Sequence, residues 1–121
     1  MKQILLAEDD ELLASLLNYR LGKEGYKVHW SCDGKEVKEQ LELQIPDIIV
    51  SDIMMPYFSG LELVDFVRNT LGSKVPIIII SSAGNEENVL SAFELGANDF
   101  ISKPVSPSEL LVRVQRELIK S

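Results

Sequence analysis

Acidic side chains follow two apolar runs that are far apart along this chain. Glu8, Asp9 and Asp10 come directly after the first run, and Asp52 comes two residues after a β-branched run in the middle of the sequence. Carboxylates that share a small space repel one another, so one of them would ordinarily take up a proton. A hard divalent cation relieves that repulsion, and carboxylates with several waters suit Mg²⁺. If the fold joins the two groups, they form a candidate Mg²⁺ site.

Two more side chains suited to phosphoryl chemistry also close apolar runs. Ser81 follows the run at residues 77–80, and Lys103 follows the last short run and precedes Pro104. A metal ion and a lysine on either side of a lone carboxylate form a clamp for a phosphoryl group in transfer. Asp52 could then act as the nucleophile and form an aspartyl phosphate, with the Ser81 hydroxyl donating to the added oxygens.

The elements that must position these residues are short apolar runs alternating with longer amphipathic segments. The expected strands span residues 4–7, 26–31, 47–51, 77–80 and 98–102. The expected helices span residues 11–23, 34–43, 59–71, 85–95 and 106–119. Strands without polar alternation are buried on both faces, which is typical of a parallel sheet covered by helices. We therefore predict an α/β flavodoxin-like (βα)5 three-layer sandwich with a five-stranded parallel sheet of order 2-1-3-4-5.

In that order the carboxyl ends of the first, third, fourth and fifth strands are neighbours, so the candidate residues should meet at one rim. The second strand lies at the edge and should not contribute. Plainer interpretations exist for each residue. Asp52 could cap a helix near Ser59, the Glu8-Asp9-Asp10 acids could cap the first helix, and Lys103 could be a surface lysine. We expect Asp10, Asn85 and Ser106 to be helix N-caps.

Composition narrows the class of protein further. The 121 residues fit one domain, which we assign to residues 1–121. A net charge of −7 argues against direct nucleic-acid binding by this domain. No apolar run approaches the roughly 20 residues of a membrane span, so we expect no membrane partner. Cys32 is the sole cysteine and excludes an internal disulfide. With no signal peptide apparent, these features predict a cytoplasmic location.

Five blocks of the sequence, in order and spread over most of its length, carry a resemblance to a known family. They are Leu5-Leu6-Ala7-Glu8-Asp9-Asp10, Ile49-Val50-Ser51-Asp52-Ile53-Met54-Met55-Pro56, Gly60, Pro76-Ile77-Ile78-Ile79-Ile80-Ser81 and Gly96-Ala97-Asn98-Asp99-Phe100-Ile101-Ser102-Lys103-Pro104. The chain resembles the CheY-like receiver domains of two-component response regulators. One block alone would be weak, but five with family-like spacing are specific.

The resemblance implies roles for the candidate residues. Asp52 would be the phosphoacceptor. Asp9 would bind Mg²⁺ directly, Glu8 directly or through water, and the backbone carbonyl of Met54 would complete the protein ligands. Glu8 stands where the family more often has Asp. Ligands from Glu8, Asp9, Asp52 and Met54 would therefore make a Mg²⁺-dependent phosphorylation site.

The resemblance also implies a switch. Ser81 and Phe100 would occupy the two switch positions, and Lys103 would be the family's lysine, with a cis Lys103–Pro104 bond. Met54 and Ala83 stand at positions that tune dephosphorylation. Because neither can orient a water by hydrogen bonding, we expect a long-lived phosphoryl state.

The implied partners are a sensor histidine kinase or phosphotransfer protein, which donates the phosphoryl group, and an output domain or downstream protein. Output would pass through the face formed by the fourth helix, fifth strand and fifth helix, and a homodimer could form through the same face. Some receiver subfamilies use an Arg of the fourth helix in such a dimer, whereas this sequence has Asn88, Val89 and Leu90 there.

Three other function classes fit this sequence less well than the switch. An aspartyl-phosphate phosphotransferase or phosphatase would need a cap domain, and the chain has no insertion long enough for one, so we expect no enzyme beyond self-phosphorylation and slow dephosphorylation. A degenerate receiver acting as a constitutive interaction module would not need the intact set Glu8, Asp9, Asp52, Ser81 and Lys103. A flavodoxin-like cofactor binder would have three acids repelling the phosphate.

Overall fold

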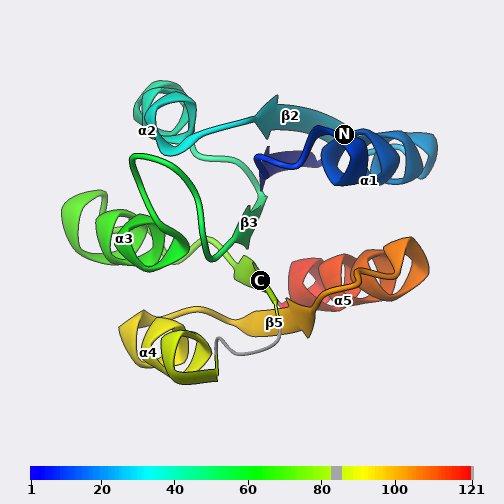
Figure 1. Ribbon diagram of the computed structural model, residues 1–121. Coiled ribbons are helices and arrows are strands. Elements are labelled where there is room, and N and C mark those ends of the chain that lie inside the picture. Colours follow the sequence, from blue (N-terminus) through cyan, green and yellow to red (C-terminus); the bar gives the residue numbers. More distant parts are fainter. Residues whose placement is uncertain (83–85, 121) are drawn as a thin grey trace.

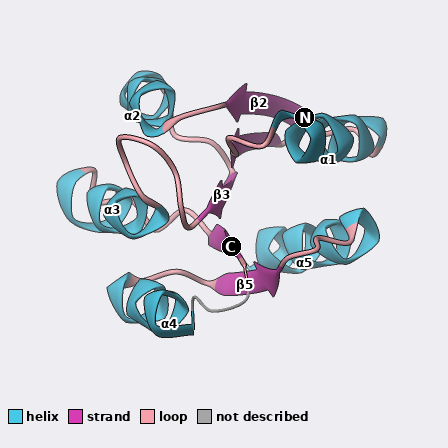
Figure 2. Ribbon diagram, in the orientation of Figure 1, coloured by secondary structure: helices cyan, strands magenta, loops and turns pink. Residues whose placement is uncertain are grey.

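A five-stranded parallel sheet forms the centre of the molecule in the computed structural model, which describes residues 1–82 and 86–120 (Figure 1, Figure 2). The strands are β1 (Gln3–Ala7), β2 (Lys27–Ser31), β3 (Ile48–Asp52), β4 (Ile77–Ser81) and β5 (Asp99–Ser102). Their order in the sheet is β2-β1-β3-β4-β5, and all neighbouring pairs are parallel. The predicted flavodoxin-like fold class and strand order are confirmed.

The helices cover both faces of this sheet. They are α1 (Glu11–Lys23), α2 (Gly34–Leu43), α3 (Gly60–Asp65), the π-helix η1 (Phe66–Thr70), α4 (Glu86–Leu95) and α5 (Pro107–Lys120). In Figure 1, α1 and α5 lie on one side of the sheet, and α2, α3 and α4 lie on the other. Both faces are therefore buried, which explains why β3 and β4 lack polar alternation.

Successive residues of a strand pack into two separate hydrophobic clusters, one on each face of the sheet. In β1, Ile4 and Leu6 join the cluster beneath α1 and α5, whereas Leu5 and Ala7 join the cluster beneath α2, α3 and α4. All four residues are at most 2% exposed. Fixing both faces of the central strands in this way fixes their register, and so fixes which residues emerge at the carboxyl end of each strand.

Helix starts follow the sequence expectation where the structure describes them. The carboxylate of Asp10 accepts hydrogen bonds from the backbone N–H groups of Leu12 and Leu13, so Asp10 caps α1 as predicted. The Ser106 hydroxyl accepts from the backbone N–H of Glu109, which confirms Ser106 as a cap of α5. The predicted cap Asn85 lies outside the described residues. These caps satisfy N–H groups that the helix itself leaves unpaired.

The third helix differs from its prediction. We expected one helix over residues 59–71, but α3 ends at Asp65 and continues as the π-helix η1. The wider η1 turn carries Arg68, whose guanidinium donates to the backbone carbonyl of Gly96 at 2.9 Å and to that of Ser73 at 2.9 Å. Gly96 has φ +122°, and a Cβ there would lie 3.0 Å from the Arg68 side chain. Glycine is therefore required at this contact.

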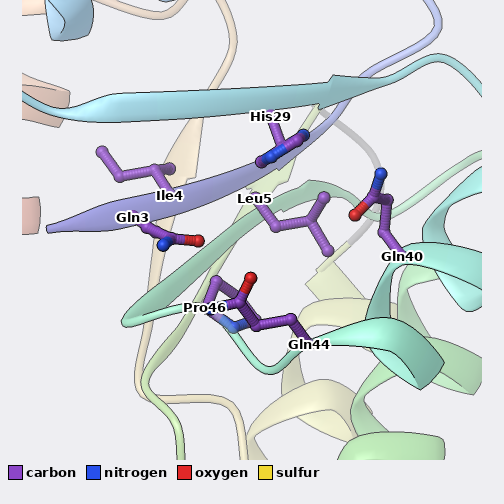
Figure 3. A pocket seen from close by; sticks show the side chains of 7 residues that line it. All are labelled: Gln3, Ile4, Leu5, His29, Gln40, Gln44 and Pro46. Atoms are coloured by element: carbon purple, nitrogen blue, oxygen red, sulfur yellow. The ribbon is translucent and has the colours of Figure 1, made fainter.

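A small cavity of about 20 Å³ lies between β1, β2 and α2, near the amino end of β1 (Figure 3). Its lining includes His29 together with Gln40 and Gln44 of α2 and its following turn. The cavity is too small for a cofactor and lies away from the carboxyl ends of the strands. His29 accordingly has no place in the candidate site, as we expected from its position in the second strand.

Among the described residues, no helix combines the length and the apolar character that crossing a membrane requires.

Candidate functional site

Three carboxylates meet where β1 and β3 end. Glu8, Asp9 and Asp52 each offer one carboxylate oxygen, and these oxygens all lie within 4.8 Å of one another. Glu8 is 0% and Asp52 4% exposed, whereas Asp9 faces solvent. We call these three residues the acidic site. Parallel pairing of β1 with β3 brings the two chain segments together, because their carboxyl ends lie at the same edge of the sheet.

Each oxygen of Asp52 is held by a different donor. Oδ1 accepts a hydrogen bond from the backbone N–H of Met54 at 3.1 Å, and Oδ2 accepts one from the Lys103 ammonium at 2.8 Å. Partial burial lowers the pKa of Lys103, but the hydrogen bond to Asp52 and the negative charges of the acidic site outweigh it and raise the pKa overall. Lys103 is therefore a fixed positive charge beside the Asp52 carboxylate at neutral pH.

The carboxylate of Glu8 is only partly satisfied. Its Oε2 accepts from the backbone N–H of Asp10 at 3.1 Å, but its buried Oε1 has no hydrogen-bond partner and lies 3.7 Å from the Lys103 ammonium. Burial raises the pKa of Glu8 from 4.5 to about 7; the Asp10 N–H opposes this shift, and the charge of Asp52 adds to it. A buried oxygen without a partner costs free energy, which a bound cation would relieve.

The donor set fits a magnesium ion. It consists of hard carboxylate oxygens from three residues, two of them buried, with one oxygen of Glu8 unpaired. Mg²⁺ prefers oxygen ligands and takes only one or two carboxylates while keeping several waters, for which the exposed side of Asp9 leaves room. Met54, the fourth predicted ligand, presents an exposed side chain and uses its N–H on Asp52.

Ser81 lies at the end of β4 on the neighbouring strand and is 3% exposed. Its hydroxyl donates to the backbone carbonyl of Ser82 at 3.1 Å, so in this conformation it is directed at the following residue and not at Asp52. The backbone N–H of Lys103 donates to the Ser81 carbonyl at 2.7 Å, and the Lys103–Pro104 bond is cis as predicted. Ser81 and Lys103 are therefore joined through the backbone.

Phe100 on β5 is 38% exposed, and its ring packs edge-on against Phe93 of α4 with centroids 5.8 Å apart and an interplanar angle of 85°. A cavity of about 280 Å³ lies between α4 and the ends of β4 and β5. It is lined by Ser81, Ser82, Glu86, Val89, Leu90, Phe93, Phe100 and Ser102. The two predicted switch residues thus border the same cavity, and Phe93 is a contact that the sequence analysis did not identify.

The edge strand β2 contributes more than predicted. The indole N–H of Trp30 donates to the backbone carbonyl of Glu8 at 2.9 Å, and the backbone N–H of Glu8 donates to the Ser31 carbonyl at 3.1 Å. We expected this strand to lie outside the site. That holds for Asp33, which follows the strand. It is wrong for the Ser31 backbone and for Trp30, since both contact the Glu8 backbone. Strand periodicity places Trp30 opposite Leu6 but does not reveal how far a long indole reaches.

A close approach between two loops supports the segment that follows Asp52. The backbone N–H of Gly34 donates to the Pro56 carbonyl at 3.0 Å, and a Cβ at Gly34 would overlap the side chain of Phe58. Only glycine permits this contact between the start of α2 and the loop after β3. The sequence carries Gly34 as a helix start but gives no sign of its partner.

A second group of potential ligands, which we call the edge cluster, consists of Cys32, Asp33 and Glu36. Asp33 caps α2 by accepting from the backbone N–H of Glu36 at 3.0 Å, and Glu36 accepts from both the N–H and the thiol of Cys32. The hydrogen bond to Glu36 is the main cause that raises the pKa of the Cys32 thiol. These groups satisfy one another.

Comparison with known proteins identifies the family. The family model of the response regulator receiver domain matches residues 4–115. The alkaline phosphatase synthesis transcriptional regulatory protein PhoP of Bacillus subtilis strain 168 is 36% identical over 120 residues, which cover 99% of this chain and 50% of PhoP. The chain therefore spans about half the length of that relative.

Solved structures show the same fold. The receiver domain of the Francisella response regulator 1452 aligns with a TM-score of 0.90 and 29% identity, covering 99% of this chain and 98% of that one. Full-length FixJ from B. japonicum aligns with a TM-score of 0.91 and 27% identity, covering 98% of this chain and 58% of FixJ. With its strand order, its acidic site and a family match over most of its length, the chain belongs to the response regulator receiver domains.

Proposed function

We propose that this domain is a phosphorylation-dependent signalling switch whose phosphoacceptor is Asp52. One observation carries the proposal. The Asp52 carboxylate is held between the Met54 N–H and the Lys103 ammonium, beside two more carboxylates that favour a divalent cation. A carboxylate oxygen of Asp52 attacks the phosphorus of a phosphohistidine, and the P–N bond breaks. Its electron pair leaves with the imidazole nitrogen, which takes a proton from solvent.

Glu8, Asp9, Asp52 and the backbone carbonyl of Met54 would hold Mg²⁺ for this reaction. The bound ion supplies positive charge that stabilises the oxygens of the transferring phosphoryl group. The unpaired Oε1 of Glu8 supports this assignment, since a cation would give this buried oxygen a partner. The Lys103 ammonium faces the same carboxylate and neutralises charge without metal.

Ser81 and Phe100 would convert the covalent change into a conformational one. When phosphoryl oxygens appear at Asp52, the Ser81 hydroxyl leaves the Ser82 carbonyl and donates to them. Phe100 then leaves Phe93 and turns into the cavity that it shares with Ser81. The equilibrium moves because the phosphoryl group binds the rearranged state better than the resting one.

The output would be read from the face formed by α4, β5 and α5. Leu90 and Val112 are exposed there, at 60% and 61%. The charges of this face are partly paired within the chain, since Asp99 binds Arg113 at 2.8 Å and Arg116 at 2.7 Å. A homodimer through this face would therefore rest on apolar contact and on re-pairing of those charges.

The proposed partners are a sensor histidine kinase or phosphotransfer protein, and an output domain or downstream protein. We propose residues 1–121 as one regulatory domain in the cytoplasm. It would promote its own phosphorylation and would act on no separate substrate. The net charge of −7 supports a domain that does not itself bind nucleic acid.

Intact-mass measurement after incubation with acetyl phosphate tests the proposal. We expect a single phosphoryl adduct that requires Mg²⁺, is absent in Asp52→Asn and persists in the matched control Asp33→Asn. A folded protein that gains no adduct from acetyl phosphate or from a phosphorylated histidine kinase would instead support a constitutive interaction module. A Mg²⁺-dependent adduct that survives in Asp52→Asn would move the acceptor elsewhere.

We also propose that the phosphoryl state is long-lived, because Met54 and Ala83 cannot orient an attacking water. Ala83 lies outside the described residues, so this expectation rests on residue type. Following the decay of the adduct by mass in Mg²⁺ buffer tests it. A half-life of only seconds would contradict the proposal, whereas Met54→Asn should shorten the half-life by supplying a hydrogen-bonding side chain.

A further inference from the structure

The peptide plane between Glu8 and Asp9 is tied to the edge strand through a single side chain. Trp30 donates its indole N–H to the Glu8 carbonyl at 2.9 Å, and the sequence contains no other tryptophan. The Glu8 carbonyl belongs to the rigid planar unit that ends at the Cα of Asp9. Fixing this oxygen therefore restricts the position of the Asp9 Cα, from which the Asp9 side chain departs.

The other hydrogen bonds of this segment leave the Glu8 carbonyl to the indole. The Glu8 N–H donates to Ser31 at 3.1 Å, which extends the pairing of β1 with β2 one residue beyond the strand. The Asp10 N–H donates to the Glu8 side chain at 3.1 Å. Asp9 itself is exposed, so packing does not hold it. Among these contacts, the Trp30 bond is the one that reaches the carbonyl between the two acids.

We propose that Trp30 is a positioning residue for divalent-cation binding at the acidic site, an inference that rests on the proposed function. Trp30 does not touch the cation. Its indole N–H holds the Glu8–Asp9 peptide plane so that the Glu8 and Asp9 carboxylates face Asp52 without a reorientation when the ion binds. Preorganised ligands bind a metal more tightly than ligands that must first be ordered.

The same geometry makes the indole a direct reporter. The indole N–H is hydrogen-bonded to the peptide that links Glu8 to Asp9, the two proposed metal ligands. A change at either ligand should therefore alter the environment of the indole N–H. Because there is one tryptophan, a ¹⁵N-labelled sample gives one indole N–H resonance. We expect this resonance to shift with Mg²⁺ along the same saturation curve as the backbone amides of Asp9 and Asp10.

Trp30→Phe keeps an aromatic ring at the edge strand and removes the N–H. We expect its Mg²⁺ dissociation constant, measured from backbone amide shifts, to rise by about three- to tenfold, the effect of losing one hydrogen bond that orders a ligand pair. His29→Gln is the matched control, since it changes an exposed residue of the same strand that lines the small cavity of Figure 3. This control should bind Mg²⁺ as the wild-type chain does.

Thermal midpoints in EDTA and at one fixed, subsaturating Mg²⁺ concentration separate positioning from simple destabilisation. A structural role would lower both midpoints of Trp30→Phe equally, whereas a positioning role also reduces the increment from subsaturating Mg²⁺. An unchanged dissociation constant in Trp30→Phe would overturn the inference while leaving the proposed function intact. A wild-type chain with no saturable Mg²⁺ response would overturn the metal site itself.

Discussion

Two groups of potential metal ligands lie at the same edge of the sheet, and they differ in what their carboxylates already bind. The edge cluster uses its acids locally, since Asp33 caps α2 and Glu36 accepts from the backbone and thiol of Cys32. The acidic site is more buried and leaves one oxygen of Glu8 without a partner. In both groups the candidate oxygens or sulfur lie within 4.8 Å of one another.

The comparison shows that proximity alone does not distinguish a candidate metal site from a group of acids with local structural roles. What separates them is hydrogen-bonding capacity that the fold leaves unused, together with burial that makes this costly. The unpaired oxygen of Glu8 costs stability at the acidic site, whereas Asp33 and Glu36 use their carboxylates in hydrogen bonds within the edge cluster. Variants of the acidic site should therefore change Mg²⁺ binding and phosphorylation, whereas variants of the edge cluster should change stability or thiol reactivity without changing Mg²⁺ binding.

The largest expected difference concerns metal-dependent phosphorylation. Asp9→Asn removes an exposed charge of the acidic site, and the rate of adduct formation with acetyl phosphate should fall roughly 100-fold or more, because several kcal/mol of charge stabilisation depend on the ion. Asp33→Asn in the edge cluster should leave that rate unchanged. Equal losses in the two variants would erase the distinction between the clusters.

The next effect concerns pH and the metal-free protein. The pKa of Glu8 is about 7 in the folded chain, above its ordinary value of 4.5. Between pH 4.5 and pH 7 the folded chain therefore binds more protons than the unfolded chain does. Stability should therefore fall as pH rises from about 4.5 to 7, by an amount on the order of 2 kcal/mol. Urea unfolding in EDTA across this range should show a steeper decline for the wild type than for Glu8→Gln. Parallel curves would contradict the assignment to Glu8.

A smaller effect is expected from the cap of α2. Asp33→Ala leaves the N–H of Glu36 without its acceptor and should cost about 1 kcal/mol of unfolding free energy, whereas Asp33→Asn retains a good cap. Thermal denaturation with and without Mg²⁺ measures both the stability lost with the cap and the stabilisation by Mg²⁺. The stabilisation gained from Mg²⁺ should be the same in Asp33→Ala as in the wild type. A smaller gain in Asp33→Ala would show that the edge cluster contributes to Mg²⁺ binding.

The smallest expected effect concerns the reactivity of the Cys32 thiol. Its hydrogen bond to Glu36 raises the thiol pKa, so alkylation near pH 8 should be slower than for an unperturbed cysteine. Glu36→Gln removes the nearby negative charge and should speed alkylation several-fold without altering Mg²⁺ binding. Identical alkylation rates would show that the thiol is not engaged by Glu36 in solution.

The fold and the location of the acidic site follow from features that a sequence displays. Unbroken β-branched runs predicted the buried strands β3 and β4, and the acids and the lysine that follow such runs had to meet once the strands were parallel. The rule that places sites at the carboxyl ends of strands depends only on strand order. Asp52 and Lys103, which are 51 residues apart, could therefore be placed together from the sequence.

What the sequence could not supply depends on side-chain reach and on local backbone adjustment. The π-helix η1 has no periodicity signal distinct from an α-helix over five residues, and the contact of Arg68 with Gly96 appears only after both segments are placed. The outward position of Phe100 depends on packing against Phe93, and the Trp30 bond depends on a long side chain crossing between strands.

The contact of Arg68 with Gly96 has a mechanical consequence for α4. Because the guanidinium binds the carbonyl of Gly96, just after the C-terminal end of this ten-residue helix, a tilt of α4 would pivot about Gly96. At about 1.5 Å per residue the helix is about 14 Å long, so a tilt of about 10° displaces its far end by roughly 2 Å while Gly96 stays in place. That far end carries Glu86, which lines the cavity shared by Ser81 and Phe100, so a small tilt of α4 would change the width of that cavity.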